Sequence, residues 1–185
     1  MSKKNNQENN LTIFEIALFA MLGAIMFCSK LLMEWIPNVH LLGMFTITFT
    51  LVYRKKALFP IYTYVLINGV YAGFATWWIP YLYIWTILWA ATMLLPKAII
   101  NPTKKWQYTL STLSLMFLCG IHGLAFGILY APAQAFMYGM SFKTTMAWII
   151  TGLPFDLIHG ISNFFAGVLI LPLVKLLKTL DKKRR

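Results

Sequence analysis

The sequence predicts an all-α polytopic membrane protein, a bundle of six transmembrane helices with both termini in the cytoplasm. Hydrophobic residues make up 59% of the 185-residue chain and charged residues 11%, whereas soluble domains carry about 25% charged residues. The mean hydropathy is +0.69. Because one crossing takes about 20 apolar residues, a chain of this length has room for six spans and little else.

The distribution of basic residues predicts the orientation. All but Lys30 and Lys143 of the 16 Lys and Arg residues fall before the first apolar segment, between the second and third, between the fourth and fifth, or after the last. Cytoplasmic loops retain Lys and Arg, so we expect residues 1–10 to be a disordered cytoplasmic lead, residues 11–178 a membrane domain and residues 179–185 a basic cytoplasmic tail. The net charge of +11 then reflects topology and contact with the lipid bilayer, and we expect no nucleic-acid partner.

The first span is predicted at residues 11–35 and ends before Pro37. It carries a stripe of small residues, namely Ala17, Ala20, Gly23 and Ala24. Because small side chains let a second helix approach closely in lipid, the stripe fits packing within the bundle or docking onto another membrane protein.

The second and third spans are predicted at residues 39–53 and 57–74. Asn38 and His40 flank the outer turn before the second span and suit either a solvated turn or one wall of a binding site. Asn68 is a polar side chain at depth in the third span, where a polar residue needs a structural or functional reason.

An aromatic stretch, TWWIPYLYIW at residues 76–85, precedes the fourth span, which ends near residue 100. An interfacial belt of Trp and Tyr is one interpretation. The density of rings and the break at Pro80 favour another, a ligand stacked between them. The candidate binding residues here are Trp77, Trp78, Tyr81, Tyr83 and Trp85, and Trp89 completes the predicted outer cluster.

The fifth span is predicted at residues 108–130 with His122 at depth, and the sixth at residues 147–177 after a semi-polar loop. In the sixth span Asp156, His159 and Asn163 are spaced i, i+3, i+7, which places them on one helical face. An Asp at the centre of a span costs about 2.5–3.5 kcal/mol, whereas a hydrogen bond between membrane helices contributes about 0.6 kcal/mol. This balance favours binding or gating, and helix–helix adhesion remains the alternative.

Sequence motifs of catalysis and nucleotide binding are absent. The chain has no HExxH, nucleophile elbow or P-loop, and Cys28 and Cys119 lie inside apolar segments without metal-ligand spacing. We therefore expect no enzyme activity, no cofactor and no metal site, and any ATP hydrolysis would be performed by partner proteins.

Four stretches, ALFAMLGA, IPNVHLLGMF, WWIPYLYIW and LPFDLIHGISNFFAG, give nearly the whole chain a resemblance to a known family. The chain resembles the substrate-binding S components of energy-coupling factor (ECF) transporters, bacterial importers of vitamins. The resemblance implies a multi-pass protein of the bacterial cell membrane that binds a vitamin near its outer surface. It also implies partnership with a transmembrane coupling protein (T component) and two cytoplasmic ATPases, with Ala17, Ala20 and Ala24 contacting the coupling protein.

Among S components the chain looks most like the cobalamin-specific type. A histidine such as His40, His122 or His159 would then hydrogen-bond to the vitamin or meet its cobalt. Folate, pantothenate and a pyridoxal or pyrimidine precursor remain open as substrates. A stand-alone secondary carrier, in which Asp156 and His159 relay protons, is the main rival, and an intramembrane enzyme or assembly factor is disfavoured by the missing catalytic motifs.

Overall fold

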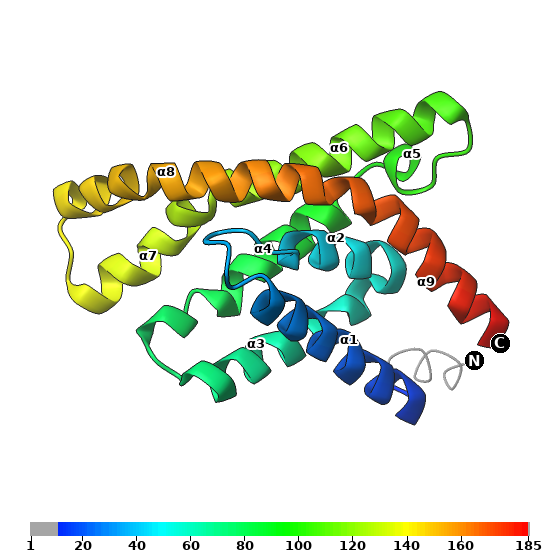
Figure 1. Cartoon of the computed structure of the whole chain (residues 1–185), viewed down its shortest axis with the longest axis horizontal. Coiled ribbons are helices and arrows are strands. Elements are labelled where there is room, and N and C mark those ends of the chain that lie inside the picture. The colour runs from blue at the N-terminus through cyan, green and yellow to red at the C-terminus, as the bar shows by residue number, and fades with distance from the viewer. Residues whose placement is uncertain (1–10, 185) are drawn as a thin grey trace, which may run out of the picture.

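The computed structural model describes residues 11–184, and these residues are helical throughout, with short connections and no strand (Figure 1). The predicted lead, residues 1–10, lies outside them. The α-helices and the 3-10 helices (η) are α1 (Ile13–Leu32), α2 (Leu42–Tyr53), η1 (Arg54–Ala57), α3 (Leu58–Ala72), η2 (Thr76–Trp78), α4 (Tyr81–Met93), α5 (Lys97–Ile100), α6 (Lys105–Leu124), α7 (Phe126–Tyr138), α8 (Phe142–Ala166), η3 (Gly167–Leu169) and α9 (Ile170–Arg184). The all-α class is confirmed.

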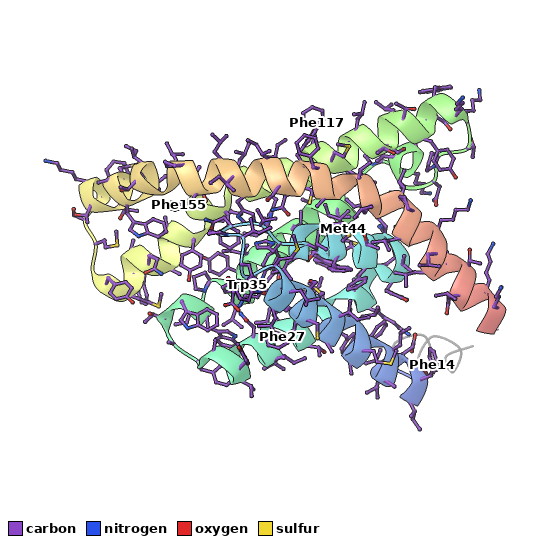
Figure 2. All side chains as sticks on the ribbon, in the orientation of Figure 1. Phe14, Phe27, Trp35, Met44, Phe117 and Phe155 are labelled. Carbon is purple, nitrogen blue, oxygen red and sulfur yellow. The ribbon has the colours of Figure 1, made fainter. Side chains whose placement is uncertain are left out.

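Three helical stretches among the described residues are long and apolar enough to cross a membrane, judged by length and composition. They are Ile13–Leu32, Lys105–Tyr138 and Phe142–Lys183, of 20, 34 and 42 residues. The helices α2, α3 and α4 are shorter, with 12, 15 and 13 residues. Large apolar side chains, Phe14 and Phe117 among them, are exposed on the outside of the bundle (Figure 2). These features are consistent with a membrane protein.

Helix α2 lies at the centre of the bundle. Its residues from Leu42 to Leu51 are buried except Phe45, including three threonines with no exposed surface. A helix that is apolar on all sides belongs in an interior, and α2 packs against α1, α4, α6 and α9. The hydroxyl of Thr50 donates to the carbonyl of Thr46 at 2.6 Å, so the helix satisfies this buried polar group internally.

Helices α6 and α8 run side by side along the longest axis of the molecule (Figure 1). Glycines make this close approach possible: a Cβ on Gly123 would lie 2.8 Å from the carbonyl oxygen of His159 and 2.9 Å from the Cα of Gly160. Small residues at a helix crossing let backbones come together. The crossing thereby fixes where the polar face of α8 meets α6.

The connections that the sequence assigns to the cytoplasm lie toward one end of the bundle, the right in Figure 1. The Lys56 ammonium pairs with Glu15 at 2.7 Å, joining η1 to the start of α1, and Lys178 of α9 donates to Asn101 after α5 at 3.5 Å. Helix α9 continues through the predicted tail to Arg184. The turn between α7 and α8 lies at the opposite end.

The semi-polar loop expected after residue 130 is wrong. The chain stays helical as α7 to Tyr138, turns at Gly139, which has a φ of +59°, and enters α8 at Phe142. Pro132 lies inside α7. Proline is tolerated inside membrane helices because neighbouring groups satisfy the backbone, so this proline did not mark the end of a helix.

Candidate functional site

The buried face of α8 carries the three polar residues that the spacing identifies. Asp156, His159 and Asn163, with Gly160, are the buried residues of this helix. The backbone N–H of Gly127 donates to Asp156 Oδ1 at 3.1 Å, while Oδ2 is buried without a hydrogen-bond partner. Gly127 is required here, because a Cβ at that position would fall 2.2 Å from Oδ2.

Aromatic and imidazole rings from the α1–α2 connection and from α4, α6, α7 and α8 meet beside this face. We call this group the aromatic cluster, and its members are His40, Tyr81, Trp85, His122, Phe126, Tyr130 and His159. Ring centroids are 4.4 Å apart for His40 and His159, and 4.8 Å for Phe126 and His159. The rings therefore touch one another, and a ligand entering between them must push them apart.

Trp85 is the centre of the aromatic cluster. Its side chain is 1% exposed, and its ring contacts those of His40, Tyr81, His122 and Phe126. The indole borders a further ring, Tyr64 of α3, at a centroid distance of 6.2 Å. Sequence reasoning missed Tyr64, Phe126 and Tyr130, because none of them belongs to a polar pattern or to the dense Trp-Tyr stretch.

Buried polar atoms without partners are concentrated in and around this cluster. Within the described part of the chain, His40 Nδ1 and Trp85 Nε1 belong to the cluster, Tyr64 Oη and Asp156 Oδ2 border it, and the others are Asn68 Nδ2, Thr46 Oγ1 and Arg54 Nη1. Most buried polar groups in proteins are hydrogen-bonded, and leaving one unpaired costs about 1–3 kcal/mol. Such a concentration is typical of groups whose partner is a ligand.

His40 reaches the cluster because α2 begins only at Leu42, so the preceding connection enters the bundle. Burial lowers the pKa of His40 to about 4, and the nearby His122 adds to the effect. The imidazole is therefore neutral at pH 7 and presents one donor and one acceptor nitrogen. Asn38, two residues earlier, is exposed with a φ of +60°, and its carbonyl accepts from Ser162 at 3.3 Å.

Several predicted binding residues are held by bonds to the protein itself. Trp78 Nε1 donates to the carbonyl of Val65 at 2.8 Å, and the Tyr83 hydroxyl donates to the carbonyl of Leu129 at 2.7 Å. Asn163 donates to the carbonyl of His159 at 2.9 Å within α8. These bonds fasten η2 to α3 and α4 to α7, and they stiffen α8.

The remaining predicted residues differ in position. The ring of Trp77 stacks edge-on against Tyr81 at 5.7 Å, and its carbonyl accepts from the Tyr130 hydroxyl. The ring of His122 lies beside Trp85, with Nε2 3.3 Å from the carbonyl oxygen of Ile84. Trp89 does not belong to the outer cluster as predicted: its Nε1 donates to the carbonyl of Arg54 at 3.1 Å, toward the opposite end.

Asn68 pairs with a residue that sequence reasoning used only for topology. The Lys30 ammonium donates to Asn68 Oδ1 at 2.8 Å, joining α1 to α3. The one available signal was that Lys30 stands apart from the other basic residues, but its partner lies 38 positions away in the sequence.

The small-residue stripe of α1 is divided between two faces. Ala17 and Ala20 are exposed and Ala24 is half-buried, whereas Gly23 faces inward. A Cβ on Gly23 would lie 2.6 Å from Thr63 Cβ. Glycine therefore serves α1–α3 packing within the bundle, and the alanines form an outer face, so Gly23 does not share their role.

A separate cavity of about 850 Å³ lies between α6, α9 and the α5–α6 connection and is lined by Lys175, Lys178 and Lys182 among others. None of the predicted binding residues lines this cavity. Among the described residues, no group of three or more His, Cys, Asp and Glu is placed to hold a metal ion. Comparison of the chain with protein-family models, with curated proteins and with solved structures found no match.

Proposed function

We propose that this chain is the substrate-binding S component of an ECF-type importer and that it binds a vitamin in the aromatic cluster. The observation that carries the proposal is the concentration of unpartnered buried polar atoms among contacting rings. Apolar walls with a few convergent polar groups are the usual composition of a small-molecule site. The resemblance of four sequence stretches to this family supports the same conclusion.

The proposed orientation has six spans and both termini in the cytosol. It is supported by the basic connections that lie toward one end of the bundle. To test it, we would replace Cys28 and Cys119 and introduce single cysteines at two exposed positions, Lys55 and Lys143. A membrane-impermeant maleimide added to intact cells should label position 143 and should reach position 55 only after permeabilisation. The reverse pattern would overturn the orientation.

The proposed partners are a transmembrane coupling protein and two cytoplasmic ATPases. The exposed alanines Ala17 and Ala20 offer a surface on which another helix can pack closely, and Ala24 extends it. Co-purification from native membranes, followed by mass spectrometry, tests the assembly. Recovery of the chain alone, under conditions that preserve other membrane complexes, would argue against it.

Among the vitamins left open by the sequence, the aromatic cluster favours those with one or two flat rings. Its rings touch, so a small ring displaces fewer groups than the corrin of cobalamin. The decisive experiment is a thermal-shift panel on the purified protein with cobalamin, folate, pantothenate, pyridoxal and pyrimidine precursors. A ligand at 100 times its Kd adds about 2.7 kcal/mol, and a panel with no stabilising vitamin would contradict the proposal.

A stand-alone proton-coupled carrier is the second candidate, favoured by one observation. Asp156 has a buried Oδ2 without a partner, and a buried carboxylate in a membrane helix is a group that carries protons in pumps and transporters. Purified protein in liposomes should then take up substrate in response to a pH gradient without ATP, and Asp156→Asn should abolish this uptake. Uptake that requires the ATPases excludes this candidate.

A further inference from the structure

The Lys30 ammonium, near the end of α1, forms its hydrogen bond with an amide and not with a carboxylate. Glu34 follows four residues later, in the turn beyond the end of α1 at Leu32. Yet the ammonium bonds to the amide oxygen of Asn68, and among the described residues no carboxylate lies within 4 Å of it. The positive charge is therefore hydrogen-bonded to an amide, and the nearby carboxylate of Glu34 interacts with it electrostatically without forming an ion pair.

Asn68 leaves its amide hydrogens without an acceptor. The residue has no exposed surface, its Oδ1 is taken by Lys30, and its Nδ2 has no partner. The bond from Lys30 also sets the orientation of the amide, because an ammonium can only donate. Lys30 and Asn68 thus present hydrogen-bond donors side by side.

Two further unpaired hydrogen-bonding groups, of Tyr64 and Trp85, link this pair to the aromatic cluster. Tyr64 lies one turn before Asn68 on the same buried face of α3, and its hydroxyl has no partner. Its ring contacts Trp85, whose Nε1–H is also unpaired. The Lys30 ammonium, the Asn68 amide and the Trp85 indole N–H are all hydrogen-bond donors. The acceptor that suits them is an oxygen-rich, negatively charged group, since bonds to charged acceptors are the stronger ones.

We propose that Lys30 and Asn68 bind a carboxylate or phosphate group of the transported molecule, whose ring lies against Trp85. This inference rests on the proposed function and narrows it to anionic substrates. It assigns a binding role to α1 and α3, in addition to the aromatic cluster formed by the α1–α2 connection, α4, α6, α7 and α8.

Matched pairs of probes test the charge directly on the purified full-length protein. Pyridoxal phosphate is compared with pyridoxal, and a phosphorylated hydroxymethylpyrimidine with its unphosphorylated alcohol, by calorimetry. We expect the anionic member of at least one pair to bind tenfold or more tightly than its neutral counterpart. Equal affinities in both pairs, for a protein that does bind a vitamin, would overturn this inference and leave the proposed function intact, whereas no vitamin binding at all would refute both.

Substitutions of Lys30 and Asn68 test whether these two residues cause the preference for the anionic probe. Lys30→Met and Asn68→Leu should each reduce the preference for the anion at least tenfold, while Lys143→Met, at the exposed lysine beside the α7–α8 turn, should keep it. Lys30→Arg retains the charge and should retain most of the preference, which separates loss of charge from loss of folding. An unchanged preference in Lys30→Met would refute the assignment.

Discussion

Tyr64 provides the sharpest test of whether the aromatic cluster is built for a ligand. Its hydroxyl is buried and unpartnered, while its ring packs edge-on against Trp85 at 79°. Tyr64→Phe keeps the ring contact and removes only the hydroxyl. Because an unpaired buried polar group costs about 1–3 kcal/mol, the unliganded protein should become more stable by about 1 kcal/mol or more, which corresponds to a rise in Tm of about 2–4 °C per kcal/mol for a chain of this size.

Tyr83→Phe is the matched control, because it is the same chemical change at a paired hydroxyl. The Tyr83 hydroxyl donates to the carbonyl of Leu129 at 2.7 Å, and a hydrogen bond of this kind contributes about 0.5–1.5 kcal/mol. The control should therefore lower the Tm of the detergent-solubilised protein while Tyr64→Phe raises it. If both variants lose stability equally, the Tyr64 hydroxyl has a partner, and the unpaired atoms no longer indicate a binding site.

The remaining predictions concern packing, assembly and the polar face of α8. Gly123→Ala should destabilise the protein by about 1–3 kcal/mol through overpacking at the α6–α8 crossing. Gly152→Ala is the control and should not, because its Cβ would meet nothing closer than 4.0 Å. Equal melting temperatures for the two variants would refute the close α6–α8 crossing. Ala20→Trp on the outer face of α1 should abolish recovery of the coupling protein while leaving vitamin affinity unchanged, and loss of both would place Ala20 inside the bundle. Asp156→Ala should weaken vitamin binding by more than tenfold, about 1.4 kcal/mol, as measured by calorimetry, and unchanged affinity would remove this residue from the site.

The sequence predicted those parts of the molecule that depend on local periodicity. The i, i+3, i+7 spacing correctly placed Asp156, His159 and Asn163 on one face, because helical geometry alone fixes that relation. The helical class followed from composition in the same way. The loop expected after residue 130 was wrong, because the chain there is helical and Pro132 lies inside α7, where neighbouring helices can satisfy the freed backbone groups.

Contacts between distant segments were beyond the reach of the sequence. Trp78 and Trp85 come from one dense aromatic stretch, yet one is tied to Val65 and the other is the centre of the cluster. The difference depends on how η2 and α4 are placed against α3 and α6, which no spacing within the aromatic stretch reveals. The pairing of Lys30 with Asn68 is of the same kind, because it requires the relative placement of two helices.

The central position of α2 has a consequence for biogenesis. Its residues Met44, Ile47 and Leu51 are covered in part by Ile170 and Val174, which are synthesised more than a hundred residues later. Until the last helix leaves the ribosome, this inner helix lacks one of its walls, so the first half of the chain cannot reach its final packing during translation. A nascent chain arrested before residue 170 should therefore expose α2 to proteases that spare the completed protein.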